Sequence, residues 1–262
     1  IFKCFSCGKG GNVITYMMEY YKLPFIEAVK QLASRAGIVF PEEQDSSDNE
    51  SQNKMETLRA VMLEAQTLYA QMLKNREALL AQAYISKRGF SHEIVQQFSL
   101  GYSPDAWKFL CEGLVKKGFK EETLEEAGLI IRKDDGAVYD RFRNRLMFPI
   151  HDVAGRTIGF GARQLTDEKG QAKYINSPET GLYSKSRVLY GLYQAKNAIR
   201  NQDAAIMTEG YADTITLHQF GFTHTIASSG TALTREQLQL LSRFTKNVFI
   251  AYDGDGAGQT AT

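Results

Sequence analysis

Three carboxylates near the end of the chain each follow a short apolar run. Glu209 follows residues 204–208, and Asp253 and Asp255 follow residues 248–252. Such runs are typical of buried parallel strands, and ligands of open α/β sheets bind where such strands end. Mg²⁺ takes carboxylate ligands from proteins and completes its shell with water and substrate phosphates. The pattern therefore predicts a Mg²⁺ site of the kind that serves phosphoryl or nucleotidyl transfer.

The residues between these runs predict the elements that would bring the three carboxylates together. Residues 211–220 have helical spacing, residues 223–227 are a β-branched run, and a capping box opens a second helix over 235–244. The order strand, helix, strand, helix, strand predicts one parallel sheet, because crossovers between parallel strands are right-handed. The alternative is that the acidic tetrapeptide at 253–256 is only a polar turn; the strand that ends at Glu209 favours the metal site.

Charge is unevenly distributed along the chain. Residues 141–200 contain eleven Lys or Arg and four Asp or Glu, a local excess of +7, whereas the whole chain carries +1. From Asp203 onward there are six acids and three bases, or −3. A basic surface beside an acidic metal site suits a polyanion and its reacting phosphate. A solvated basic face is the alternative interpretation of the same charges.

Two features of the basic segment indicate how it would bind a ligand. Arg141, Arg143 and Arg145 alternate with other residues, so on an extended strand they would share one face at steps of about 7 Å. A turn at residues 152–155 predicts a hairpin, and Gly159 and Gly161 lie on its returning strand. We expect these glycines to let a ligand approach the sheet closely.

Cys4 and Cys7 form a Cys-x-x-Cys pair that is followed by glycines. Two thiolates about one turn apart are half of a structural zinc site, which takes four ligands. A redox-active pair is the alternative. Cys111 is predicted to be a buried free thiol, and three cysteines do not form a disulfide framework.

Composition divides the chain into four parts. Residues 41–54 are acidic and polar without an apolar period, which predicts a flexible linker. Residues 1–40 would be part of a zinc-binding domain, 55–202 a basic α+β subdomain, and 203–262 a truncated α/β subdomain with a parallel sheet. We expect a cytoplasmic protein without membrane contact, since no run resembles a membrane span or a signal peptide. We also expect a fragment at both ends, because the first residue lies within a predicted strand and the last precedes a predicted helix.

Several motifs resemble one known family. Glu209-Gly-Tyr-Ala-Asp213 and Asp253-Gly-Asp255-Gly-Ala-Gly258 resemble the two motifs of a Toprim domain, the metal-binding core of bacterial DNA primases and of type IA and II topoisomerases. Residues 139–143, 158–163 and 173–180 resemble the N-terminal subdomain of the RNA polymerase domain in bacterial DnaG-type primases. The cysteine pair with its glycines is similar to the second half of the zinc ribbon of that family. The resemblance covers nearly the whole chain.

This resemblance implies a nucleotidyltransferase that joins ribonucleoside triphosphates into short RNA primers on a single-stranded DNA template at the bacterial replication fork. It implies Mg²⁺ or Mn²⁺ on Glu209, Asp253 and Asp255, with Asp213 tuning the site without binding the metal, and a further acidic pair beyond the end of this chain. It also implies Zn²⁺ on Cys4 and Cys7, with the other two ligands upstream. Nucleotide or template binding is assigned to seven side chains: Arg141, Arg143, Arg145, Arg163, Lys173, Asn176 and Lys185.

Partners and alternatives follow from the same resemblance. A replicative helicase is expected to bind through a C-terminal domain outside this chain. The primase half of a primase-helicase is one alternative, which only downstream sequence would exclude. A non-catalytic module that binds single-stranded DNA is the other, and it would tolerate loss of the carboxylates. A topoisomerase is disfavoured, because the chain has no room for strand-gate domains and its basic motifs do not match.

Overall fold

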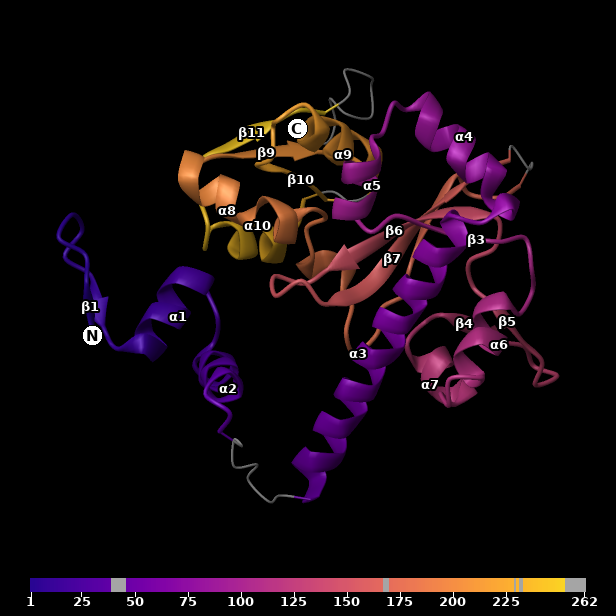
Figure 1. Ribbon diagram of the computed structural model, residues 1–262, viewed down its shortest axis with the longest axis horizontal. Helices are drawn as coiled ribbons and strands as arrows, with labels where there is room; N and C mark the ends of the chain where they lie inside the picture. Colours follow the sequence, from indigo (N-terminus) through magenta and orange to yellow (C-terminus); the bar gives the residue numbers. More distant parts are fainter. Residues whose placement is uncertain (39–45, 167–169, 229, 231–232, 253–262) are drawn as a thin grey trace. The chain divides into compact units, whose positions relative to one another are not determined.

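The computed structural model describes residues 1–38, 46–166, 170–228, 230 and 233–252. The chain divides into two compact units, Ile1–Gln52 and Asn53–Thr262 (Figure 1). Asp253 and Asp255 lie outside the described residues. In the described ranges, no helix combines the length and apolar character needed to cross a membrane.

The first unit contains a two-stranded hairpin followed by two helices. Asn12 caps the first helix, since its side-chain oxygen accepts a hydrogen bond from Thr15 N at 2.9 Å. Lys22, with φ of 56°, ends that helix in the left-handed conformation. Two helices between residues 12 and 36 match the sequence prediction. The elements are β1 (Phe2–Lys3), β2 (Gly10–Gly11), α1 (Val13–Tyr21) and α2 (Phe25–Arg35).

The long helix α3 (Ser46–Leu73) begins earlier than predicted. The prediction of a flexible linker over 41–54 is therefore wrong from residue 46 onward. The polar residues there include good helix formers, and neither Gly nor Pro occurs between 46 and 73, so nothing interrupts the helix. The second unit begins at Asn53. The buried face of α3 carries Leu58, Val61, Met62, Ala65 and Tyr69.

An antiparallel sheet with strand order β3-β6-β7-β8 forms the centre of the second unit. Asp152 Oδ1 accepts hydrogen bonds from Ala154 N at 2.9 Å and Arg156 N at 3.0 Å, which closes the predicted hairpin between β6 and β7. One face packs on α3 and on a separate hairpin with its two helices (Figure 1). The strands are β3 (Gly101–Ser103), β6 (Arg145–His151), β7 (Thr157–Gln164) and β8 (Tyr174–Asn176); the hairpin is β4 (Ile130–Arg132) with β5 (Val138–Asp140), beside α6 (Phe109–Val115) and α7 (Glu121–Glu126).

A parallel sheet with strand order β10-β9-β11 follows in the sequence. Its strands alternate with helices in the predicted order, and both partners of β9 run parallel to it. Thr234 and Gln237 form the predicted capping box at the start of α10. The prediction of an α+β part followed by an α/β part is confirmed. The elements are α8 (Leu192–Gln202), β9 (Ala205–Thr208), α9 (Tyr211–Gln219), β10 (Thr225–Ala227), α10 (Arg235–Leu241) and β11 (Val248–Ile250).

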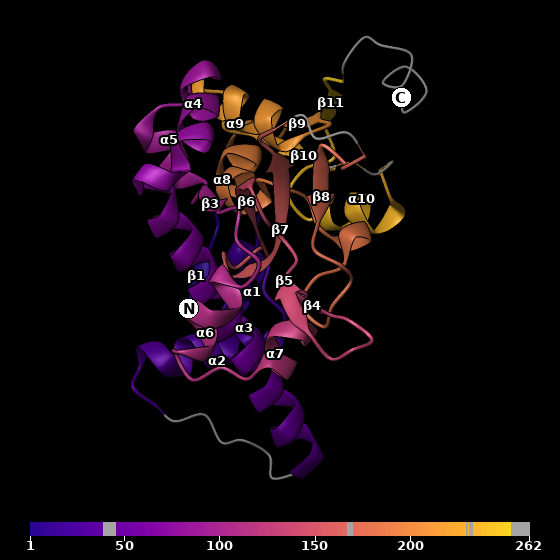
Figure 2. The same cartoon turned by 90° about the vertical axis from the view of Figure 1, so that its right-hand side faces the viewer.

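Helix α9 connects the two sheets of the second unit. Its buried residues Tyr211, Ala212 and Ile215 belong to the same apolar core as Phe148 and Ile150 of β6. Figure 2 shows β7 and β8 beside the parallel sheet. The start of α9 is therefore fixed against the antiparallel sheet, which brings residues after β9 close to residues of β8. The same core includes residues of α4 (Leu79–Lys87) and α5 (His92–Gln97), preceded by the 3-10 turn Arg76–Ala78.

Candidate active site

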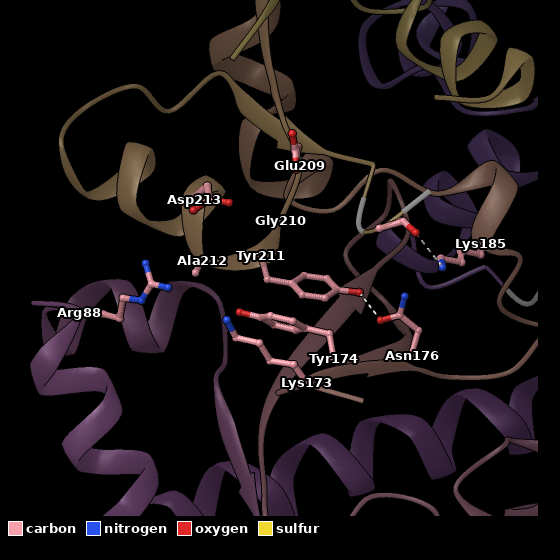
Figure 3. Close-up of a pocket in the computed structure, with 11 residues that line it drawn as sticks. Arg88, Lys173, Tyr174, Asn176, Lys185, Glu209, Gly210, Tyr211, Ala212 and Asp213 are labelled. Carbon is pink, nitrogen blue, oxygen red and sulfur yellow. Dashed lines mark hydrogen bonds between the residues drawn. The ribbon is translucent and has the colours of Figure 1, made fainter. Parts of the chain in front are cut away.

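A pocket of about 390 Å³ lies between β8, the end of β9 and the start of α9 (Figure 3). It unites both parts of the predicted site, the acidic residues after β9 and several of the basic or amide residues. Figure 3 shows the acidic side chains and those of β8 on opposite sides of the Tyr211 ring. The lining residues are Arg88, Lys173, Tyr174, Asn176, Lys185, Glu209, Gly210, Tyr211, Ala212, Asp213 and Gly230.

The turn from β9 into α9 positions the acidic side of the pocket. Glu209 follows the central strand directly, and Gly210 is the N-cap of α9, which places Asp213 in the first helical turn. A Cβ on Gly210 would lie 3.1 Å from Asp213 Oδ2, so glycine allows this carboxylate to fold back over the turn. An acid in the first turn is also favoured by the helix dipole. Asp213 thus lines the pocket, and its role in tuning a metal site stays a prediction.

The donor set fits a divalent metal only in part within the described residues. Glu209 and Asp213 give two hard oxygen donors beside cationic side chains, a combination suited to Mg²⁺ and phosphates. No group of three or more His, Cys, Asp or Glu side chains is placed to hold an ion anywhere in those ranges. Strand β11 pairs in parallel with β9, with Ile250 opposite Met207, so both strands end at the same edge of the sheet. The predicted set of Glu209, Asp253 and Asp255 stays a prediction.

Asn176 is held by a tyrosine of the acidic segment. Tyr211 donates its hydroxyl proton to Asn176 Oδ1 at 2.6 Å. The Tyr211 ring stacks on Phe148 at 5.1 Å between centroids and meets Tyr190 edge to face at 4.6 Å. The ring lies over Gly161, where a Cβ would come within 2.3 Å of Tyr211 Cζ. The bond fixes which end of the Asn176 amide is turned toward the tyrosine.

The glycines of β7 thus have a different role from the one predicted. They were expected to admit a ligand, but Tyr211 occupies the space over Gly161, and Tyr183 lies 3.0 Å from a Cβ on Gly159. The close approach is made by the protein itself. The sequence alone does not show whether a ligand or a tyrosine ring fills the space over these glycines, because either one requires that the residue has no Cβ.

Lys185 is positioned by a short turn (Lys185–Arg187) that is anchored on both sides. Its backbone N–H donates to Glu179 Oε1 at 2.8 Å, and its carbonyl accepts from Gln237 Nε2 at 3.1 Å. Its Nζ donates to Gly230 O at 3.3 Å at the edge of the pocket. Lys185 thus presents a cation from a fixed backbone, while Lys173, exposed beside β8, presents the other.

A second pocket, of about 430 Å³, contains the three arginines. The Arg143 guanidinium lies over two aromatic rings, 4.3 Å from the Trp107 centroid and 5.1 Å from that of Tyr139. Trp107 is 62% exposed, so its side chain can meet a ligand although Arg143 lies over one face of the ring. A cation beside an exposed aromatic ring is suited to a nucleic-acid backbone with unstacked bases. The pocket is lined by Asp105, Trp107, Arg141, Arg143, Asn144, Arg145, Gln164, Thr166, Gln171 and Ile175.

The three arginines do not form the predicted stripe along one strand. Strand β6 begins only at Arg145, and Asn144 before it has φ of 50°, so residues 141–144 are a loop. Arg145 is buried and donates to Ala172 O at 3.1 Å. Arg141 is half-buried, which lowers the pKa of its guanidinium. The three arginines line one pocket, but the regular spacing expected of an extended strand is absent, because a left-handed residue breaks the extended run.

Strand β8 separates the two pockets. Tyr174 and Asn176 line the first pocket, whereas Ile175 between them lines the second. This follows from the alternation of side chains along a strand. Burial, together with the neighbouring Tyr84, raises the pKa of Tyr174 to about 12, so this phenol stays protonated at neutral pH. A ligand that reached both pockets would have to pass over one edge strand.

Arg163 lines neither pocket among the described residues. Its guanidinium carbon lies 4.0 Å from the centroid of the Tyr84 ring, and its Nη1 donates to Gln164 O at 2.8 Å. Arg88, which the sequence reasoning missed, takes a place in the first pocket instead. An Arg-Gly at a helix end is an ordinary C-terminal signal, so nothing local marked Arg88 as a ligand-facing residue.

The cysteine pair lies in the first unit, in the turn between β1 and β2. Cys4 N donates to Lys9 O at 2.6 Å, and Gly8 N donates to Cys4 O at 2.9 Å, so the turn is a compact knuckle. Hydrogen bonds from the backbone N–H and the side chain of Cys7 lower the pKa of Cys4, which favours a thiolate. The pair fits half of a tetrahedral zinc site. Cys111 is the buried free thiol that was predicted.

Asp140 beside the second pocket should make stability depend on pH. Burial raises its pKa from 3.8 to about 6, although the carboxylate accepts bonds from Leu110 N at 2.7 Å and Cys111 N at 3.0 Å. The folded state then holds the proton more tightly than the unfolded state, so this contribution to stability falls as pH rises between those values. The free energy of unfolding of wild type relative to Asp140→Asn should fall by about 2–3 kcal/mol from pH 4 to pH 7. Urea unfolding across that range measures this difference, and a constant or rising difference would contradict it.

Comparison with known proteins covers nearly the whole chain. Residues 1–48 match the CHC2 zinc finger, residues 68–196 the N-terminal domain of the DNA primase catalytic core, and residues 206–262 a Toprim-like domain. The DNA primase of Clostridium acetobutylicum is 44% identical over 263 residues, covering 100% of this chain and 43% of that protein. This chain therefore spans less than half the length of that relative.

Solved structures agree with these matches. The RNA polymerase domain of Mycobacterium tuberculosis primase DnaG has a TM-score of 0.73 at 40% identity, covering 78% of this chain and 68% of that one. A DnaG primase catalytic domain bound to ssDNA has a TM-score of 0.72 at 41% identity, covering 80% of this chain and 67% of that one. Sequence motifs, sheet order and overall likeness point the same way, and the chain belongs to the family of bacterial DnaG-type DNA primases.

Proposed function

We propose that this chain carries the catalytic centre of a DNA primase, a nucleotidyltransferase that makes short RNA primers from ribonucleoside triphosphates on single-stranded DNA. One observation carries the proposal: the first pocket brings Glu209 and Asp213 together with Lys173, Asn176 and Lys185. Acids for a divalent metal and cations for phosphates are the two requirements of phosphoryl chemistry. We assign residues 55–202 to substrate binding and 203–262 to the metal-binding part.

Different residues of the first pocket would bind different parts of the nucleotide. Lys173, Lys185 and Arg88 would bind phosphate oxygens, and the Asn176 amide would orient the nucleotide by hydrogen bonding. Glu209, Asp253 and Asp255 would hold Mg²⁺ or Mn²⁺, with Asp213 beside them. The bound metal would neutralise charge on the attacking and leaving oxygens. Tyr211 would keep the Asn176 amide in one orientation through the bond to Oδ1.

The second pocket would bind the template. Trp107 would stack a base, and the loop arginines, Arg143 above all, would contact backbone phosphates. Arg145 donates a hydrogen bond to Ala172 O and so would mainly stabilise the segment before β8. Arg163, packed on Tyr84, would act indirectly. The template would reach the nucleotide over the edge strand β8. Likeness to a DnaG domain bound to ssDNA supports this assignment.

The test uses the intact protein with single-stranded DNA, ribonucleoside triphosphates and Mg²⁺, and short RNA products are expected. Arg143→Ala should weaken template binding by about tenfold, and Trp107→Leu by a similar factor, since base stacking is worth roughly 1–3 kcal/mol. Loss of one phosphate contact should also reduce the slope of log affinity against log salt by about 0.7. Arg243→Ala removes the same charge outside both pockets and should change neither value. DNA binding without any RNA product would favour a non-catalytic module.

The remaining assignments stay predictions. Zinc on Cys4 and Cys7 would need two further ligands, because these are the only cysteines or histidines among the first fifty residues. The replicative helicase as partner and the cytoplasmic location rest on the family resemblance.

A further inference from the structure

Tyr84 on α4 lies between two arginines that come from different parts of the fold. Arg88, at the end of the same helix, donates from Nε to the Tyr84 hydroxyl at 2.9 Å. Arg163 of β7 packs on the ring, with its guanidinium carbon 4.0 Å from the centroid. The Tyr84 hydroxyl thus contacts Arg88 alone of the two arginines, whereas the ring carries Arg163 at close range and Arg88 at 5.5 Å from the centroid.

The two arginines differ in what they face. Arg88 is exposed and lines the first pocket, and Figure 3 shows its guanidinium on the side of Ala212 and Asp213. Arg163 does not reach that pocket: its Nη1 donates to Gln164 O, and its Nε is buried with no hydrogen-bond partner among the described residues. Arg163 therefore supports the tyrosine, and the tyrosine contacts the arginine that can meet a ligand.

An exposed arginine at a helix end needs such support to bind a ligand well. Its long side chain has many rotamers, and a free side chain loses that freedom only when the ligand arrives. A hydrogen bond donated by Nε fixes the plane of the guanidinium and leaves the two terminal nitrogens for a bidentate contact with an anion. Geometry fixed before binding favours binding of the ligand.

We propose that Tyr84 is a positioning residue, which holds Arg88 in the pocket for an anionic group of the nucleotide while Arg163 fixes the tyrosine ring from behind. This inference rests on the proposed function, because the anion is taken to be a phosphate of the nucleotide. It explains why an arginine of the basic segment lies outside both pockets. It also connects α4, far away in the sequence, to the chemistry after β9.

Tyr84→Phe tests the proposal in the intact protein, because it removes the hydroxyl and leaves the ring under Arg163. The KM for ribonucleoside triphosphates should rise about three- to tenfold, while template affinity and thermal stability stay at wild-type values. Tyr193→Phe is the matched control: its ring also carries a cation, with Lys196 Nζ 4.6 Å from the centroid, but it lines neither pocket. That variant should leave the KM unchanged.

A double-mutant cycle separates positioning from mere packing. In an Arg88→Ala background, Tyr84→Phe should cause a much smaller rise in KM, because the hydroxyl would act mainly through Arg88, with Tyr174 as its other neighbour. An equal rise in both backgrounds, or no rise in the single variant, would overturn the proposal. Binding of Mg²⁺ with ATP, measured by calorimetry, gives the same comparison without turnover. If wild type binds this nucleotide but makes no RNA, the proposed function fails while the role of Tyr84 is still decided.

Discussion

Replacing Glu209 with glutamine in the intact protein should reduce primer synthesis by at least about 10²-fold. Glu209 directly follows the central strand of the parallel sheet and lines the pocket that also contains Lys173 and Lys185. Glutamine keeps the size of the side chain but removes the charge that a divalent metal needs. A metal contributes several kcal/mol to stabilising the charge of the transition state, and each 1.4 kcal/mol is a tenfold change in rate.

The measurement is incorporation of labelled ribonucleotides at saturating Mg²⁺, with template affinity measured separately by fluorescence anisotropy. Template affinity should stay within about twofold of wild type, since the residues that we assign to the template line the other pocket. Glu236→Gln is the matched control, because this glutamate is exposed in the first turn of α10 and lines neither pocket. If Glu209→Gln synthesised primers at a rate within threefold of wild type, Glu209 would not be a metal ligand.

Local patterns in the sequence predicted the elements that surround the acidic side of the site. Short apolar runs, a capping box and the residues after each strand depend on neighbours in the sequence, and the order of β9, α9, β10, α10 and β11 follows from them. The position of Glu209 and Asp213 in one pocket was predictable for the same reason. Asp253 and Asp255 stay predictions, since they lie outside the described residues.

The basic side depended on contacts that no local pattern records. A left-handed Asn144 ended the extended run of arginines, and Arg163 packed on Tyr84, which is 79 positions away in the sequence. Arg88 lines the pocket from the end of α4, where the local sequence is that of an ordinary helix C-terminus. In each case tertiary packing decided the position, and the residue type alone was compatible with either outcome.

Gly161→Ala should lower both stability and activity, although it adds only a methyl group. Gly161 lies between Phe148 and Asn176 in the register of neighbouring strands, and Tyr211 fills the space above it. A Cβ would lie 2.3 Å from Tyr211 Cζ, so the ring must move away from Phe148 and from Asn176. Overpacking of this kind costs about 1–3 kcal/mol, and we expect a lower Tm.

Activity should fall further than stability, because Tyr211 belongs to the segment that carries Glu209 and Asp213. We expect at least a tenfold loss of kcat/KM for nucleotides under conditions where the variant is fully folded. Gly181→Ala is the control, since its Cβ would meet only Met55 Sδ at 3.6 Å, an ordinary contact. Tyr211→Phe removes the bond to Asn176 without the clash and should reproduce part of the kinetic loss with little change in Tm. If Gly161→Ala kept both the Tm and kcat/KM of wild type, the ring over this glycine would have no role in arranging the pocket.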